Sequence, residues 1–552
     1  MIKKKFITVF QIALLLAILI FSQSCQSLQS LINDSQDSSI ETSQDQQSDS
    51  ESSEESSEES SEESSEEESS SSSEETTSSN EQSSTSNNTS NNDSTTNSTA
   101  NSSTSNSTSN TSAIIDLELS NSNYSAYTII GINLSTSSSG SNESAGTLPL
   151  APKASYLFKK VPSKRQFSER TRTTQLIKQL GETKQLRTRF HSSQQQFRSH
   201  LPISDSVTSY RFFSYNEQSQ VVERDATRVY NGTYCYIFVR NGSVNNIDTE
   251  LVSSIGQFFD EHIYQQSVEA LNQTHYDVDS NEKVVLYYAD IDAAGYFYAV
   301  DMFSKQSYSI SNETDMLYIH DDYLQSQNSE ATLEENARVI THEFTHMLSR
   351  SHRFDNNDFN SYESWIEEAL AEGVASLILD SPITDHFHNL SSNNKLRNGT
   401  SLFNWGGDYY SYSLAHTFAE YARIQSDMDI TFYKSLLANY SVSNDYEAFF
   451  DIVEQNALEN SSPKFNSIEA LLRDYRLANV INADTGKYSY GNANGNRYKN
   501  YISSPLSPES NTVNLGPGGA IYLYFDSENY SDFSSFEPQS EGDNIQYYRL
   551  NK

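Results

Sequence analysis

Two histidines and a glutamate near the middle of the chain have the types and spacing of a hydrolytic metal site. They form the sequence His342-Glu343-Phe344-Thr345-His346, in which two imidazoles stand four residues apart. On a helix this spacing places both rings on one face, so both can bind one zinc ion. Glu343 lies about 100° around the helix from His342 and can face the metal's water as its general base. The pattern therefore predicts zinc-dependent hydrolysis.

A third ligand is predicted in a glutamate-rich segment downstream. A catalytic zinc takes three protein ligands and keeps one position open for water. Glu368 follows His346 by 22 residues, which leaves room for a loop and a returning helix. Glu372, one turn further, is predicted to accept a hydrogen bond from a ligand imidazole, whereas Glu367 is predicted to point away. The alternative is that these are ordinary solvated helix carboxylates.

The elements that must position these residues follow from hydrophobic periodicity. Short runs of β-branched and aromatic residues predict strands at 233–239, 284–288 and 520–525. Apolar residues at helical spacing predict helices, and these are 255–263, 334–349, 366–379 and 414–424. Strands followed by helices with long connections indicate an α+β fold.

The segments HEFTHML and WIEEALAEG resemble the gluzincin metallopeptidases. Within that group the chain is most similar to the hyicolysin family of secreted bacterial neutral peptidases. This likeness covers about residues 220–430 and includes 277–281, 294–297 and 311–319. It implies a zincin-like core and endopeptidase activity on protein or peptide substrates. It also implies one Zn²⁺ per chain, with His342, His346 and Glu368 as its ligands; the family's usual Asn before the third ligand is Glu367 here.

The same resemblance indicates a donor for the oxyanion that forms during peptide hydrolysis. Hyicolysin-like sequences carry a tyrosine that opens a helix, and Tyr412 fits that frame, with Tyr410 as the next choice. His416 replaces an aromatic residue of the family pattern and lies one turn from Tyr412, so it is a second expected donor. With 35 tyrosines in the chain, packing is the alternative role for each tyrosine.

The N-terminus predicts export and attachment to a membrane. Three lysines precede an apolar run at 6–21, which is typical of a secretion signal. The sequence Ser22-Gln23-Ser24-Cys25 that follows resembles a bacterial lipoprotein signal, although Ser22 stands where an aliphatic residue is usual. We expect acylation of Cys25 and a lipid-anchored envelope protein at the cell surface or outer membrane. Plain secretion and an uncleaved anchor are the alternatives.

Composition divides the chain into five predicted parts. Residues 1–25 are the signal, and 26–112 a disordered acidic tether, since 33–112 hold 19 acidic residues and no lysine, arginine or aromatic residue. Residues 113–215 are predicted as an N-terminal β piece and a basic linker. The metallopeptidase domain is expected at 216–480 and a small β appendage at 481–552.

Charge and cysteine content narrow the classes of protein. With 36 basic and 74 acidic side chains the formal net charge is −38, so the chain lacks the basic surface that nucleic-acid phosphates require. Two cysteines are too few for a disulfide framework, and Cys235 lies in an apolar strand pattern typical of a buried residue. We expect a monomer with no nucleic-acid partner.

Several other readings stay open. A tethered adhesin or binding lipoprotein with a structural or inactive zinc site is the main alternative function, but it leaves Glu343 without a use. An aminopeptidase-like exopeptidase lacks its usual substrate-amine clamp upstream. Clustered oxygens at 277–279 suggest calcium, although a turn leading into a strand is favoured. His386 and His388 are predicted as exposed loop residues, and His352 as a cationic residue near a helix C-terminus.

Overall fold

The computed structural model describes part of the chain. The described residues are 114–117, 126–137, 140–148, 203–325, 328, 331–356, 363–392, 396–439, 445–491, 498, 512–526 and 544–551. They all belong to the unit of residues 102–552. The predicted signal, Cys25, the predicted acidic tether and residues 151–200 of the predicted basic linker lie outside them. Within the described ranges, no helix has the length and apolar character needed to cross a membrane.

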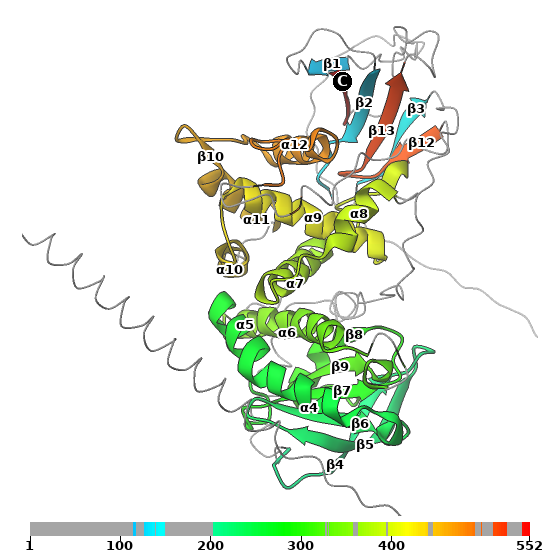
Figure 1. Ribbon diagram of the computed structural model, residues 1–552, viewed down its shortest axis with the longest axis vertical. Helices are drawn as coiled ribbons and strands as arrows, with labels where there is room; N and C mark the ends of the chain where they lie inside the picture. Colours follow the sequence, from blue (N-terminus) through cyan, green and yellow to red (C-terminus); the bar gives the residue numbers. More distant parts are fainter. Residues whose placement is uncertain are drawn as a thin grey trace, which may run out of the picture. The chain divides into compact units, whose positions relative to one another are not determined.

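Residues 209–320 contain the strands of a six-stranded mixed sheet (Figure 1). In spatial order its strands are β4 (Ser209–Tyr215), β5 (Val221–Asn231), β6 (Cys235–Arg240), β7 (Val284–Ala289), β9 (Met316–His320) and β8 (Gly295–Phe297). The pairs β4–β5–β6 are antiparallel, β6–β7–β9 are parallel, and β8 pairs antiparallel with β9 at the edge. Every residue of β7 and β9 is buried, as expected for parallel strands covered on both faces.

Helices cover one face of this sheet. They are α4 (Thr249–Phe258) and α5 (Tyr264–Leu271), joined by a π-helical turn (Phe259–Ile263), and α6 (Leu333–Asp355). Their apolar side chains share a core with Ile237, Leu286 and Leu317 of the sheet. Alternate residues of the same strands, such as Phe238 and Tyr287, fill an aromatic core on the other face.

The second half of the described chain is mostly helical. It contains α7 (Ser364–Ile378), α8 (Thr384–Ser392), α9 (Tyr409–Gln425), α10 (Thr431–Ala438), α11 (Asp445–Asn456) and α12 (Ile468–Ile481). Helix α7 packs on both α6 and α9, and α8 packs on α9. Trp365, in the first turn of α7, is fully buried against the rings of Phe403, Phe418 and Phe449 at centroid distances of 5.2–5.8 Å. This aromatic contact fixes the start of the helix that carries Glu368.

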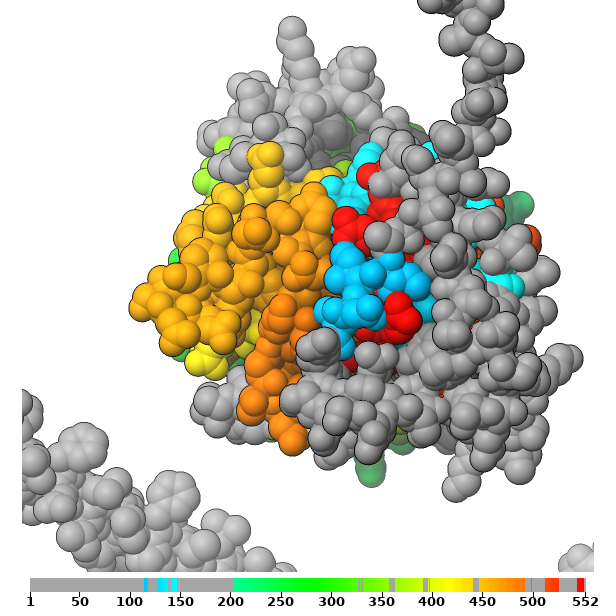
Figure 2. Space-filling view, turned by 90° about the horizontal axis from the view of Figure 1, so that it is seen from above, coloured from blue at the N-terminus to red at the C-terminus, as the bar shows by residue number. Residues whose placement is uncertain are grey.

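A second sheet joins distant parts of the chain. Its order is β1 (Ile114–Leu117), β14 (Ile545–Asn551), β2 (Ala126–Asn133) and β13 (Ala520–Asp526), and β3 (Glu143–Thr147) pairs separately with β12 (Thr512–Leu515). Leu477 and Val480 of α12 pack on Ile130 and Ile132 of β2. Figure 2 shows these cyan and red strands side by side, with the orange α12 next to them. Strands from the predicted N-terminal piece and the predicted appendage thus pair with each other.

Short elements complete the described fold. They are 3₁₀ turns η1 (Val244–Asn246), η3 (Ala299–Met302), η4 (Asp321–Leu324) and η5 (Leu396–Asn398), and the two-residue strands β10 (Leu458–Glu459) and β11 (Ser462–Pro463).

The mixed α+β class is confirmed, and each predicted element exists. The predicted strands correspond to β6, β7 and β13, and the predicted helices to α4 with its π-helical turn, α6, α7 and α9. Helix α9 begins five residues before the predicted start, because Asp408 caps it by accepting from Ser411 N. Strand β4 lies within the predicted linker, and Cys235 is buried as predicted.

Candidate metal centre

Helix α6 sets the direction of the two predicted histidine ligands. Thr332 caps the helix by accepting a hydrogen bond from a first-turn backbone amide. Phe344 and Met347 bury one face of α6 in the core against the sheet. His342 and His346 lie four residues apart on another face and meet carboxylates of α7.

Three side-chain atoms converge between α6 and α7. The Nε2 atoms of His342 and His346 are 3.1 Å apart. Oε2 of Glu368 lies 3.2 Å from the first of these nitrogens and 3.5 Å from the second. The structure therefore brings together the three residues that the sequence singles out as ligands.

This triangle fits a small divalent metal ion. Zinc bonded at about 2.0–2.1 Å in tetrahedral geometry has ligand atoms about 3.3–3.4 Å apart, close to the three observed separations. All three atoms are of the types that bind zinc in proteins, namely imidazole nitrogens and a carboxylate oxygen. His342, Glu343 and His346 also form a group whose ligand atoms lie within 4.8 Å of one another.

Two further glutamates contact the outer nitrogens of the imidazoles. Oε1 of Glu372 lies 3.3 Å from Nδ1 of His342. Oε1 of Glu367 lies 3.6 Å from Nδ1 of His346, and Ser349 Oγ donates a hydrogen bond to its other oxygen at 3.4 Å. The prediction that Glu367 points away is wrong. The prediction took into account only the face of α7 that carries Glu368. The Nδ1 atoms of the two histidines lie one turn of α6 apart, so a carboxylate on a neighbouring face of α7 can reach the second of them.

Glu343 lies between α6 and the edge strand β8. Its side chain is 1% exposed, and its Oε2 accepts a hydrogen bond from the backbone amide of Phe297 at 3.1 Å. Strand β8 comes this close because Gly295 has no side chain: a Cβ there would lie 2.6 Å from Val339 Cγ1 and 3.2 Å from Glu343 Cγ. The backbone of β8 thus holds the predicted general base.

The electrostatics of the cluster favour a bound cation. Burial alone would raise the pKa of Glu368, but the neighbouring His346 and His342 hold it at about 2. Burial alone would lower the pKa of His346, yet Glu368, Glu367 and Glu343 raise it well above its usual range. Buried carboxylates outnumber the imidazoles in this cluster, and a bound cation would balance their charge.

The two predicted oxyanion donors lie on α9. Tyr412 is buried, and its ring packs on Trp405 at a centroid distance of 5.0 Å. His416 is fully buried, and neither of its ring nitrogens has a hydrogen-bond partner among the described residues. Burial and the nearby His386 lower the pKa of His416 to about 4. Tyr410 is half-buried, and the catalytic role of each of these residues stays a prediction.

His386 was predicted as an exposed loop residue, and this is wrong. Both His386 and His388 lie on α8 and not in a loop; His386 is fully buried, whereas His388 is exposed as predicted. The Nδ1 of His386 is 2.9 Å from Ser413 Oγ, and its Nε2 is 3.6 Å from Oε2 of Glu372. The apolar residues of α8 pack inward and bury His386 with them. Because this helix is short, its hydrophobic pattern gives only weak evidence of which side is buried.

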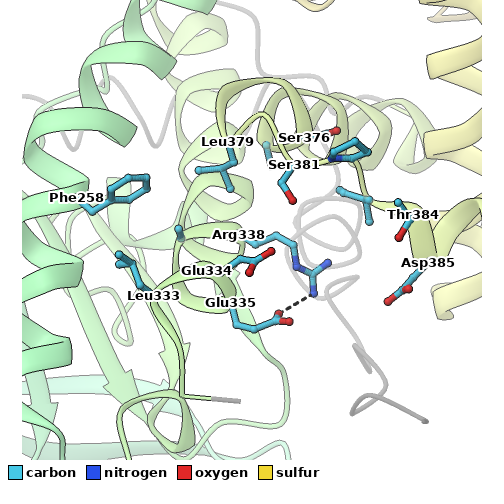
Figure 3. A pocket seen from close by; sticks show the side chains of 14 residues that line it. Phe258, Leu333, Glu334, Glu335, Arg338, Ser376, Leu379, Ser381, Thr384 and Asp385 are labelled. Atoms are coloured by element: carbon cyan, nitrogen blue, oxygen red, sulfur yellow. Dashed lines mark hydrogen bonds and ion pairs between the residues drawn. The ribbon is translucent and has the colours of Figure 1, made fainter. Parts of the chain in front are cut away.

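A cavity of about 490 Å³ lies between the first turns of α6 and the last turn of α7. Figure 3 shows its lining, which comes from α4, α6, α7, the connection between α7 and α8, and the start of α8. Arg338, four residues before His342, and Ser376, four residues after Glu372, place it one helical turn from the metal centre. Arg338 pairs with Glu335 at 3.4 Å, and Glu334 and Asp385 add two further carboxylates, so the lining is net acidic.

No protein-family model matches the chain, and no curated protein matches it. The chemistry of the cluster therefore rests on its own geometry. The imidazoles of His342 and His346 and the carboxylate of Glu368 can hold a metal ion. The carboxylate of Glu343, on the same helix as the two histidines, can exchange protons beside that ion.

Proposed function

We propose that the protein is a zinc-dependent endopeptidase tethered to the bacterial cell surface through an acylated Cys25. The observation that carries the proposal is the convergence of two imidazole nitrogens and Glu368 Oε2 at 3.1–3.5 Å, beside the buried carboxylate of Glu343. The resemblance to gluzincins, and to hyicolysin in particular, supports the same assignment and a zincin-like core.

His342, His346 and Glu368 would hold the ion. When bound, zinc supplies a Lewis acid that polarises a carbonyl and acidifies water. Glu343 takes a proton from the attacking water while the water oxygen bonds to the scissile carbonyl carbon. Glu343 then gives that proton to the leaving amine as the carbon–nitrogen bond breaks. Tyr412 is proposed as the hydrogen-bond donor to the oxyanion.

Glu372 and Glu367 orient the ligands. A carboxylate that accepts from Nδ1 of a histidine fixes the tautomer in which Nε2 is free to bind a metal. Glu372 stands 3.3 Å from Nδ1 of His342, and Glu367 stands 3.6 Å from that of His346. Each ligand imidazole therefore has its own carboxylate.

Strand β8 supports an endopeptidase with an extended substrate. It is the edge strand of its sheet, and an edge strand can add a peptide strand through backbone hydrogen bonds. Because Phe297 of this strand donates to Glu343, a peptide paired along it would pass beside the base. The net acidic cavity one turn away would favour a basic side chain of that substrate.

The test uses the purified full-length mature protein, unfolded casein as substrate and quantified zinc. We expect the parent to cleave casein with one zinc at this centre. Glu343→Gln should lose cleavage and keep that zinc, and Glu269→Gln, an exposed glutamate on α5, is the control. Bound zinc without cleavage in parent and control would instead favour a tethered binding lipoprotein. A parent without zinc would contradict the site itself.

A further inference from the structure

A second cluster of metal-type ligands lies where two parallel strands begin. Strands β7 and β9 are neighbours and run parallel, so their N-terminal ends meet at one edge of the sheet. Asp277 lies in the turn that precedes β7, and Asp315 directly precedes β9. His275 comes from the segment after α5. One ligand atom from each of these three residues lies within 4.8 Å of the other two.

The imidazole of His275 is buried and aimed into this cluster. The residue is 7% exposed, and its Nδ1 lies 3.1 Å from the hydroxyl of Tyr264. Its Nε2 faces Oδ2 of Asp315 at 3.8 Å, which is too long for a hydrogen bond, and has no hydrogen-bond partner among the described residues. A buried polar atom without a hydrogen-bond partner destabilises the folded state unless a ligand or ion binds it.

The neighbouring carboxylates also lack a balancing charge. Asp315 is 2% exposed, and Oδ1 of buried Asp279 has no hydrogen-bond partner in the described chain. Across the described ranges no lysine or arginine forms an ion pair with Asp277, Asp279 or Asp315.

A third group of possible ligands shows the contrast. His320, Asp321 and Asp322 lie equally close together. There, however, the guanidinium of Arg240 approaches Asp321 at 2.5 Å, so a cation from the chain already balances the buried carboxylate. In the part of the chain that the structure describes, the cluster at His275 has no such partner.

We infer that His275, Asp277 and Asp315 bind a second divalent metal ion, of the transition-metal type, apart from the peptidase centre. One neutral imidazole with carboxylates suits zinc or manganese, since calcium prefers oxygen ligands alone. Asp279 Oδ1, buried without a hydrogen-bond partner among the described residues, is a further donor on the same turn. The ion would join the end of α5 to the starts of β7 and β9.

This site would also support the C-terminal part of α6. The backbone amide of Tyr276 donates to Ser351 Oγ at 2.8 Å, and Gln273 Nε2 donates to Asp355 Oδ2 at 2.9 Å. The segment that carries His275 is therefore tied to the helix that carries His342 and His346. The inference depends on neither of those histidines and does not rest on the proposed peptidase activity.

The test counts metal ions in the full-length mature protein. After purification with zinc and removal of loose metal, we expect two zinc ions in the parent and one in His346→Ala. Asp277→Asn and His275→Gln should each hold one zinc and keep casein cleavage. Asp277 is half-buried, so its variant should fold even if changes at Asp315 do not. Asp322→Asn, in the group that Arg240 balances, is the control and should keep two.

Three results would overturn the inference. The first is a single zinc in the parent that His346→Ala removes. The second is a second ion that persists in both Asp277→Asn and His275→Gln. The third is that the parent protein binds calcium and no transition metal at this position, and that His275→Gln still binds it. The imidazole of His275 would then not be a ligand. A loss of one ion in both variants, with manganese able to replace it, would support the proposal.

Discussion

Glu372 lies 3.3 Å from Nδ1 of His342 through one carboxylate oxygen. Its other oxygen faces Nε2 of buried His386 at 3.6 Å. Glu372 therefore has an imidazole on each side, one from α6 and one from α8, and the shorter contact is the one to His342. The candidate metal centre is thus approached from α8 as well as from α7.

Removing the charge of Glu372 should weaken metal binding. We expect Glu372→Gln to lower zinc affinity about 10–100-fold, because the ligand imidazole loses its orienting acceptor. Competition with a chelator of known affinity measures this change. Glu269→Gln on the surface of α5 is the matched control. Unchanged zinc affinity in Glu372→Gln would mean that Glu372 does not orient His342.

Adding one methyl group to β8 should disturb the general base. In Gly295→Ala the new Cβ would lie 2.6 Å from Val339 Cγ1, and such overpacking costs about 1–3 kcal/mol. We expect lower stability and slower casein cleavage with zinc still bound. Because Val339 is the closest contact, adding Val339→Ala should restore part of both. If the double variant is no better than Gly295→Ala, the proposed contact is not the cause.

The sequence predicts the metal centre better than it predicts the surroundings of that centre. The four-residue spacing of His342 and His346 depends on helix geometry alone, which is local. The contact of Glu367 with His346 depends on how α6 and α7 cross, and the burial of His386 depends on α9. A local sequence pattern predicts neither the crossing of α6 and α7 nor the packing of α8 on α9.

The second sheet shows the same limit. Strand β13 is predicted from its own apolar run, but its pairing with β2 joins residues such as Ala520 and Ile132. Periodicity reports which residues are buried, and it does not report their partners when hundreds of residues intervene. The predicted division into an N-terminal piece and a C-terminal appendage came from composition, which cannot reveal such pairing.

The cavity beside the centre should select basic side chains. Glu334 and Asp385 line it with carboxylates, so Glu334→Gln with Asp385→Asn should reduce its attraction for a cation. We expect kcat/KM for peptides with lysine or arginine near the cleaved bond to fall about threefold to tenfold, since partly exposed charges contribute about 1 kcal/mol. Neutral peptides of the same length should be cleaved at an unchanged rate. Equal losses for both peptide sets would contradict the assignment.

His416 should be replaceable by an aromatic residue. Both of its ring nitrogens are buried without hydrogen-bond partners among the described residues, so a polar ring gains nothing there. We expect His416→Phe to fold with equal or higher stability and to cleave casein. Thermal unfolding and the casein rate measure the two effects. A stable variant that binds zinc but has lost cleavage would show instead that His416 is the oxyanion donor.

Helix α9 contains a buried ion pair that should make stability depend on acid pH. Burial would raise the pKa of Glu420, but Arg423, bonded to it at 2.8 Å and 3.0 Å, lowers it from 4.5 to about 2. Because the folded pKa is depressed, this stabilisation is complete above about pH 4.5 and is lost as the pH falls toward 2. Glu420→Gln should therefore destabilise the protein by about 3–5 kcal/mol at pH 7, since it leaves Arg423 buried without its partner.

The difference in unfolding free energy between parent and Glu420→Gln should shrink as the pH falls from 4.5 to 2, where about half of the parent's Glu420 carboxyl is protonated in the folded state. Denaturant unfolding at several pH values measures this difference. The exposed pair of Arg211 and Asp225 provides the control, because water screens this pair and Asp225→Asn should change stability little at any pH. A difference between parent and Glu420→Gln that stays constant with pH would mean that the cost comes from packing and not from the charge of Glu420.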